Sequence, residues 1–169
     1  IYYNREKGLK AVNVNNTPYL SFDLYDNDKL VRCVKTKLVG SYNVINILCA
    51  LEVGIYFGLS LDDCLRGVEN YVPSNNRSQL IRSEKNEIIM DSYNANPSSM
   101  NEALVNFNML RYDNKVLILG DMLELGAISE EEHQRICDMI CSMESIKEII
   151  LVGDNFYRCT ISKGVKFRN

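Results

Sequence analysis

DSYNANPSSM, residues 91–100, is the stretch that decides the fold, because it joins a strand pattern to a helix pattern. The apolar run Ile88-Ile89-Met90 comes directly before it. Beyond it, apolar residues recur at helical spacing, which predicts a helix that begins at Pro97 with Asn96 as its N-cap. In α/β folds, ligands bind where such strands end. The turn is therefore a candidate site, although Asp, Asn and Ser are also ordinary turn residues.

The chain from residue 78 onward alternates between strand and helix patterns. Strands are predicted at 80–83, 87–90, 116–119 and 149–152. The last two are continuous apolar runs, which are typical of strands buried on both faces. Ser129 and Glu132 have the spacing of a capping box, which predicts the start of another helix. Short connections between strands and helices imply a parallel sheet with right-handed crossovers.

The first part of the chain has a different pattern. Residues 1–40 are β-rich, and Asp26-Asn27-Asp28 predicts the turn of a hairpin. A helix follows, opened by Ser41-Tyr42-Asn43 and extending to about Leu59, and it is apolar nearly all round, which is typical of a buried helix. Ser60 is expected to be the N-cap of a second helix.

A short polar segment, PSNN at residues 73–76, separates the two patterns. We therefore predict an α/β protein with two domains, residues 1–73 and residues 74–169. The pattern fades after Asn155, so we expect the second domain to be truncated.

The composition is that of an ordinary globular protein, with 169 residues, 46% hydrophobic and 24% charged. A net charge of -3 and the lack of a basic run argue against nucleic acid as a partner. The sequence has neither a run of membrane-spanning length nor a signal peptide, so we expect no membrane partner. None of its six cysteines form a Cys-x-x-Cys pair, which favours a reduced, cytoplasmic protein.

Two pairs of polar residues are candidates for ligand binding. Asn43 and Asn46 lie three residues apart in the first turn of a predicted helix, where their amides could meet an adenine edge or could simply cap the helix. Asp121 and Glu124 lie in the turn GDMLELG, where they could meet a cation or an amine or could simply be solvated.

Metal and phosphate motifs are absent from the sequence. His133, Cys137 and Cys141 could share one helix face, but eight residues of helix span about 12 Å, too far for one ion. We therefore predict no metal site. There is no Gly-x-x-x-x-Gly-Lys-Ser/Thr loop, so the chain has no phosphate cradle of its own.

Three segments together resemble the Mur ligases. They are GSYNVIN at 40–46, DSYNANPSSM at 91–100, and LGDMLELG at 119–126 followed by His133. The first is similar to a segment shared across the family, and the other two are similar to segments of the member that adds a dipeptide. Two residues depart from the pattern: Tyr42 replaces a histidine, and Asn76 replaces a glycine.

The resemblance implies a three-domain ATP-dependent amide ligase of peptidoglycan precursor synthesis. Residues 1–73 would end its middle ATPase domain, and residues 74–169 would form most of its Rossmann-like, parallel-sheet C-terminal domain. ATP would phosphorylate the carboxylate of UDP-N-acetylmuramoyl-tripeptide, and the amine of D-alanyl-D-alanine would attack the acyl phosphate. The P-loop and the Mg²⁺ ligands would lie before Ile1, so the chain alone would be inactive.

The same resemblance assigns roles to seven residues. Those implied for ATP are Asn43 and Asn46 at adenine, Arg77 at the phosphates as the catalytic residue, and Asp91 at the ribose. Those implied for the dipeptide are Tyr93, Asn94 and Asn96. Asp121 and Glu124 receive no role, and a monomer is expected. The alternatives are a sibling Mur-type or folylpolyglutamate-type ligase, and a non-catalytic nucleotide-binding module.

Overall fold

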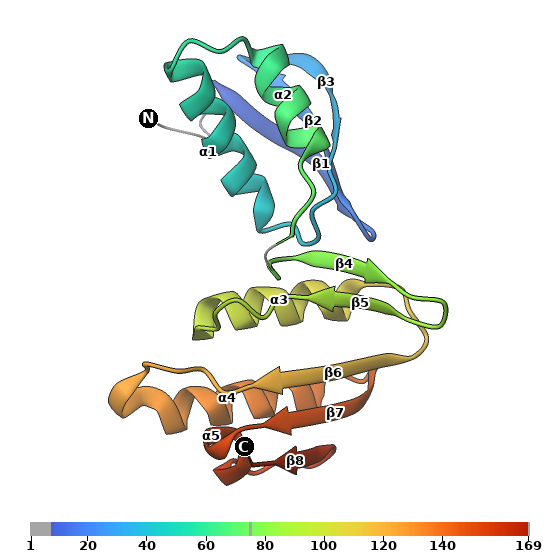
Figure 1. Ribbon diagram of the computed structural model, residues 1–169, viewed down its shortest axis with the longest axis vertical. Coiled ribbons are helices and arrows are strands. Elements are labelled where there is room, and N and C mark those ends of the chain that lie inside the picture. Colours follow the sequence, from blue (N-terminus) through green and yellow to red (C-terminus); the bar gives the residue numbers. More distant parts are fainter. Residues whose placement is uncertain (1–7, 75, 169) are drawn as a thin grey trace. The chain divides into compact units, whose positions relative to one another are not determined.

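Figure 1 shows a computed structural model of the chain, which describes residues 8–74 and 76–168. Residues 1–7, for which a β-rich structure is predicted, lie outside the described part. The chain forms two compact units, residues 1–93 and residues 94–169. The domain boundary proposed from sequence at residues 73 and 74 stays a prediction. Within the described ranges, no helix is long and apolar enough to cross a membrane.

The first unit contains an antiparallel sheet, two helices and a hairpin. The sheet has the order β1 (Leu9–Asn16), β2 (Leu20–Asp26) and β3 (Lys29–Lys35). The helices are α1 (Asn43–Tyr56) and α2 (Leu61–Asn70), and the hairpin pairs β4 (Gln79–Arg82) with β5 (Glu87–Met90). The two helices cover one face of the three-stranded sheet (Figure 1), and the core lies between them.

Several local predictions for this unit are confirmed. Asn27 and Asp28 form the turn between β2 and β3 with φ angles of 44° and 67°, which short polar residues tolerate better than branched ones. Ser60 caps α2, since its hydroxyl accepts the N–H of Asp63. The two short strands predicted at 80–83 and 87–90 are present as β4 and β5, and the structure pairs them antiparallel.

The prediction that α1 is buried all round is wrong. Its buried side chains are Asn43, Ile47, Leu48 and Leu51, which form a single stripe. Ile45 and Ile55 are exposed on other faces. The helix is apolar nearly all round, but only the stripe that faces the sheet and α2 is covered.

The second unit is a parallel sheet with helices packed on it. Its elements are α3 (Pro97–Met109), β6 (Lys115–Gly120), a 3-10 turn (Gly126–Ile128), α4 (Ser129–Ser142), β7 (Ile146–Val152), α5 (Asp154–Arg158) and β8 (Val165–Phe167). The sheet has the order β6-β7-β8, with both pairs parallel (Figure 1). Side chains of α3, α4 and α5 pack with those of β6 and β7 in one core.

The cap of α3 is confirmed, but two other expectations for this unit are corrected. The Asn96 side chain accepts the N–H of Ser99, and Pro97 occupies the first helical position. The β6 strand is buried on one face only, since Val116 and Ile118 are 46% and 67% exposed. Ser129 forms no capping box, because the chain enters α4 directly from the 3-10 turn. Beyond Asn155, the structure contains most of α5 and the whole of β8, which the sequence pattern missed.

The cysteines of this unit differ in their expected reactivity. Burial raises the pKa of Cys137 to about 12 and also raises the pKa of Cys159. At Cys141, partial burial raises the pKa, but hydrogen bonds from Ser162 and its neighbour outweigh it and lower the pKa overall. Because the thiolate is the nucleophile, iodoacetamide should label Cys141 well before Cys137 and Cys159. The exposed Cys33 of the first unit should also be labelled before these two. Peptide mass spectrometry measures this order, and equally fast labelling of Cys137 in the folded protein would contradict it.

Candidate functional site

A pocket of about 390 Å³ opens in the first unit between α1, the end of α2 and the turn before β4. This volume is within the usual range of small-molecule sites, about 300–1,000 Å³. The residues that line it are Leu38, Asn43, Asn46, Ile47, Ala50, Gly67, Val68, Tyr71, Arg77 and Ser78. Three residues singled out from the sequence, Asn43, Asn46 and Arg77, therefore share one pocket.

Helix α1 supplies one wall of the pocket. Its contributions are Asn43, Asn46, Ile47 and Ala50, at positions i, i+3, i+4 and i+7, which fall on one helix face. Polar side chains occupy the first turn of this face and apolar ones the next two turns. The wall therefore offers hydrogen bonds at one end and an apolar surface at the other.

The two asparagines have different surroundings. Asn43 is 8% exposed, and its Nδ2 donates to the Val39 carbonyl at 2.9 Å and to Ser78 Oγ at 3.3 Å. Its Oδ1 accepts from Asn46 Nδ2 at 3.3 Å. Within the described residues, Asn46 makes this one hydrogen bond, so its carbonyl oxygen and one N–H remain for a ligand. Asn43 therefore orients the side chain of Asn46, and Asn46 presents its free amide atoms to the pocket.

Arg77 lies in a turn whose flanking residues have unusual backbone angles. Asn76 and Ser78 have φ angles of 56° and 49°, in the left-handed region that favours glycine and tolerates asparagine. This explains how asparagine stands where the family pattern has glycine. The Asn76 carbonyl accepts the N–H of Ser92 at 2.8 Å, which ties the turn to the end of β5.

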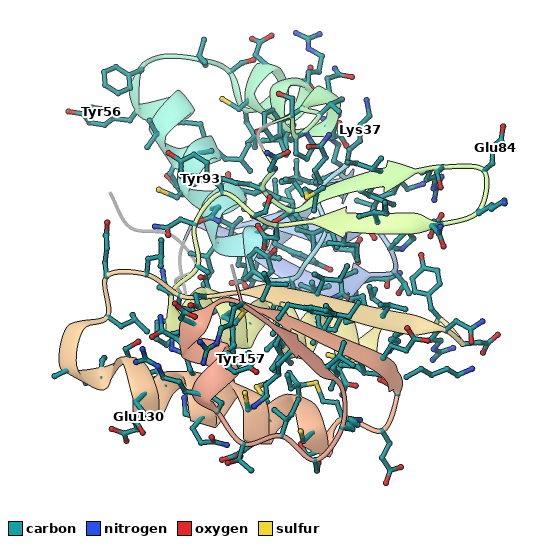
Figure 2. The ribbon with its side chains drawn as sticks, turned by 60° about the horizontal axis from the view of Figure 1, so that its bottom comes forward. Lys37, Tyr56, Glu84, Tyr93, Glu130 and Tyr157 are labelled. Atoms are coloured by element: carbon teal, nitrogen blue, oxygen red, sulfur yellow. The ribbon has the colours of Figure 1, made fainter. Side chains whose placement is uncertain are left out.

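The guanidinium of Arg77 stacks on the ring of Tyr93, with 3.7 Å from its central carbon to the ring centroid. Tyr93 follows β5, is labelled in Figure 2, and is 64% exposed. Stacking fixes the plane of the guanidinium and leaves its N–H groups, which point outward within that plane, for hydrogen bonds. The pair therefore presents a planar, positively charged group at the pocket.

Ser78 is the centre of the network that holds this turn, and sequence reasoning missed it. It is 4% exposed, and its hydroxyl lies 2.6 Å from the hydroxyl of Tyr42. Tyr42 donates to Asp91 Oδ2 at 3.2 Å, and the N–H of Ser78 donates to Asp91 Oδ1 at 3.2 Å. Since the single hydroxyl proton of Tyr42 goes to Asp91, the Ser78 hydroxyl donates to Tyr42 and accepts from Asn43. The residues next to Ser78 in the sequence give no sign that it is the centre of a hydrogen-bond network.

The replacement of histidine by Tyr42 is explained by this network. The phenol bridges Ser78 and Asp91, and its ring lies over Gly40, where an added Cβ would be 2.3 Å from the ring. Gly40 also has a φ of 94°, so only glycine suits this position. The two oxygens of Asp91 accept from Tyr42 and from the N–H of Ser78, so Asp91 links Tyr42 to the turn that carries Arg77. Its role at a ribose stays a prediction.

Asn94 and Asn96 belong to the second unit, where both amides make local bonds. Asn96 Oδ1 accepts the N–H of Ser99 at 2.9 Å, and Ser99 Oγ accepts the N–H of Asn96 at 3.2 Å. Asn94 Oδ1 accepts the N–H of Ala95 at 2.9 Å. Among the described residues, the side-chain Nδ2 groups of Asn94 and Asn96 make no hydrogen bond, which leaves them for a ligand. Their roles in dipeptide binding, like that of Tyr93, stay predictions.

The third motif forms a structural contact at the ends of β6 and β7. The carboxylate of Asp121 accepts the backbone N–H groups of Asn155 and Phe156, each at 2.9 Å, and so caps α5. Gly153 makes room for it, because a Cβ there would lie 2.2 Å from the carboxylate carbon. Glu124 lies in the same loop with a φ of 65°. The acid at 121 thus joins two segments that are far apart in the sequence.

His133 completes this contact and is fully buried. Its Nε2 accepts the N–H of Met122 at 3.0 Å, so Nδ1 bears the proton and donates to the Ser129 carbonyl at 2.6 Å. Its ring packs edge-on against Phe156, with centroids 4.7 Å apart. The histidine holds the loop after β6 in place, and both of its ring nitrogens are engaged in hydrogen bonds.

Comparison with known proteins gives consistent matches. Residues 76–165 match the family described as Mur ligase, glutamate ligase domain. The UDP-N-acetylmuramoyl-tripeptide–D-alanyl-D-alanine ligase of Bacillus subtilis is 36% identical over 118 residues, which is 69% of this chain and 26% of that protein. The ligase of the same name from Treponema pallidum is 32% identical over 127 residues, 75% of this chain and 27% of that protein. The chain thus spans about a quarter of the length of these relatives.

Solved structures agree with the sequence matches. The crystal structure of MurF from Acinetobacter baumannii has a TM-score of 0.83 at 26% identity and covers 95% of this chain and 36% of that one. MurF from Thermotoga maritima in complex with ADP has a TM-score of 0.78 at 16% identity, which shows the shared fold. Since the family match covers more than half of the residues, the chain belongs to the Mur ligase family.

Proposed function

We propose that these residues are part of an ATP-dependent ligase that adds D-alanyl-D-alanine to UDP-N-acetylmuramoyl-tripeptide through an acyl phosphate. The names of the relatives support this reaction, as does the dipeptide-type motif at residues 91–100. Residues 1–73 would then end the ATPase domain, and residues 74–169 would form most of the C-terminal domain. The family match at residues 76–165 supports the second assignment.

The observation that carries the proposal is the shared pocket of Asn43, Asn46 and Arg77. An amide with a donor and an acceptor to spare, as at Asn46, suits the edge of adenine. A planar guanidinium, as at Arg77, suits the oxygens of a phosphate. Groups suited to the two ends of a nucleotide therefore face one cavity.

The pocket suits the base of ATP, but it does not supply all of the groups that bind the phosphates. It has apolar walls beside the free amide of Asn46, but the chain lacks a P-loop motif. Among the described residues, no group of three or more His, Cys, Asp or Glu could hold a metal ion. The phosphate cradle and the ligands of Mg²⁺ would come from other parts of the ATPase domain. ATP would supply the phosphoryl group that activates the carboxylate.

The residues after β5 would meet the incoming amine. We assign Tyr93, Asn94 and Asn96 to the D-alanyl-D-alanine site, with Asp91 close to the ribose. Tyr93 supports this assignment, since its ring is exposed and touches the guanidinium of Arg77. The ligase would act as a cytoplasmic monomer.

The proposal is tested by the mass of the product that the full-length ligase forms from ATP, Mg²⁺ and UDP-N-acetylmuramoyl-tripeptide. D-alanyl-D-alanine should be added as a unit, while D-alanine, L-lysine and glutamate should not be added. Addition of a single amino acid would indicate a sibling ligase, and nucleotide binding without any product would indicate a binding module. The 169-residue chain alone should show no ATP turnover, since its sequence contains no P-loop motif.

A further inference from the structure

Gly67 lies in the interior of α2, where glycine has no evident structural use. Glycine is among the poorest helix formers, because it loses the most backbone freedom on folding. A Cβ added at Gly67 would meet no atom within 4 Å, so packing does not exclude a side chain. Gly54 in α1 shows the opposite case, since a Cβ there would lie 2.5 Å from the sulfur of Cys64.

The space beside Gly67 belongs to the pocket that contains Asn46 and Arg77. Gly67 is exposed and lines this pocket, and a Cβ there would meet no atom within 4 Å, so the space beside it is open to the cavity. The missing side chain therefore enlarges the pocket at the cost of helix propensity.

Tyr71 lines the same pocket at the end of α2. Its N–H bonds the carbonyls of Gly67 and Val68 at 3.0 and 3.4 Å, which fixes its backbone directly after the last turn of the helix. Its side chain is nevertheless 49% exposed. A half-exposed aromatic ring beside an open, apolar space is suited to stack on a planar heterocycle.

We infer that Gly67 and Tyr71 form the seat of the nucleobase: the ring of Tyr71 stacks on the base, and Gly67 leaves the room that the base occupies. Asn46 then lies at the base edge, and Arg77 lies on the same pocket toward the phosphates. Val68 and Ala50 supply apolar surface to the same cavity. This inference rests on the proposed function, and it adds the two residues that select a base of this size.

The test uses the full-length ligase and measures KM for ATP and kcat separately. Gly67→Leu should raise KM for ATP at least about ten-fold with little change in kcat, because leucine fills the cavity that the base needs. Tyr71→Ala should raise KM by about ten-fold, and Tyr71→Phe should restore it, since phenylalanine keeps the ring. Asn70→Leu places the same side chain at an exposed position of α2 outside the pocket and should leave KM unchanged.

Two further measurements separate a lost base seat from a damaged fold. Gly67→Ala should raise the melting temperature, since alanine favours the helix and its Cβ meets no other atom. Inhibition by inorganic tripolyphosphate, which has phosphates but no base, should be the same in Gly67→Leu and in the wild type. An unchanged KM for ATP in Gly67→Leu would overturn the inference, and so would an equal loss of tripolyphosphate inhibition. A wild-type ligase that forms no product would instead overturn the proposed function.

Discussion

Replacing Arg77 with alanine in the full-length ligase is expected to lower kcat for phosphate release by about 100-fold or more. The guanidinium stacks on Tyr93 and Arg77 lines the pocket, so it is placed to neutralise charge that develops on the phosphates. Removal of one such preorganised donor destabilises the transition state more than it destabilises the bound substrate, so kcat falls. Steady-state phosphate release at saturating ATP measures the effect.

Two control variants distinguish the role of Arg77 from a general effect of charge. Arg77→Lys keeps the charge but not the planar fork, so it should recover only part of the rate. Arg82→Ala removes an arginine from the neighbouring strand, where it pairs with Glu87, and should leave the rate unchanged. If kcat for phosphate release in Arg77→Ala stays within about three-fold of the wild-type value, the guanidinium does not act on the phosphates.

Replacing His133 with alanine is expected to lower the free energy of unfolding of the second unit by about 3–5 kcal/mol. The imidazole is fully buried, so its removal leaves a cavity next to Phe156. It also leaves the buried N–H of Met122 without an acceptor and the Ser129 carbonyl without its donor. Urea denaturation of the wild type and the variant measures the loss.

A second measurement follows the bond itself. Exchange of the Met122 amide proton should be slow in the wild type and much faster in His133→Ala. His133→Gln places an amide oxygen near the former position of Nε2, and it should restore part of both the stability and the protection. A loss below about 1 kcal/mol, with Met122 still protected, would mean that the histidine is not the support of this loop.

Elements with local signals could be predicted from the sequence. The start of α3 follows from Asn96 and Pro97, and the β2–β3 turn follows from Asn27 and Asp28, because these residues act on their own backbone. The structure of the second unit differs from the prediction where residues distant in the sequence stabilise an element. Helix α5 has five residues, and its N–H groups are capped by Asp121, 34 residues away, which no local pattern reveals.

The same distinction holds for the candidate site. Asn43, Asn46 and Arg77 could be picked out from motifs, and the structure places them on one pocket. Ser78 could not, because its importance comes from Tyr42 and Asp91, which are 36 and 13 residues away. Strand β6 shows a further limit, since a run of four apolar residues does not reveal whether one face of the strand or both will be covered.

The most direct test of the central claim is phosphate release by the full-length ligase with ATP, Mg²⁺ and UDP-N-acetylmuramoyl-tripeptide, with and without D-alanyl-D-alanine. Release that requires the dipeptide and is lost in Arg77→Ala is the result that we predict. Release that a single amino acid supports in place of the dipeptide would contradict the proposed substrate, and release that persists in Arg77→Ala would contradict the proposed site.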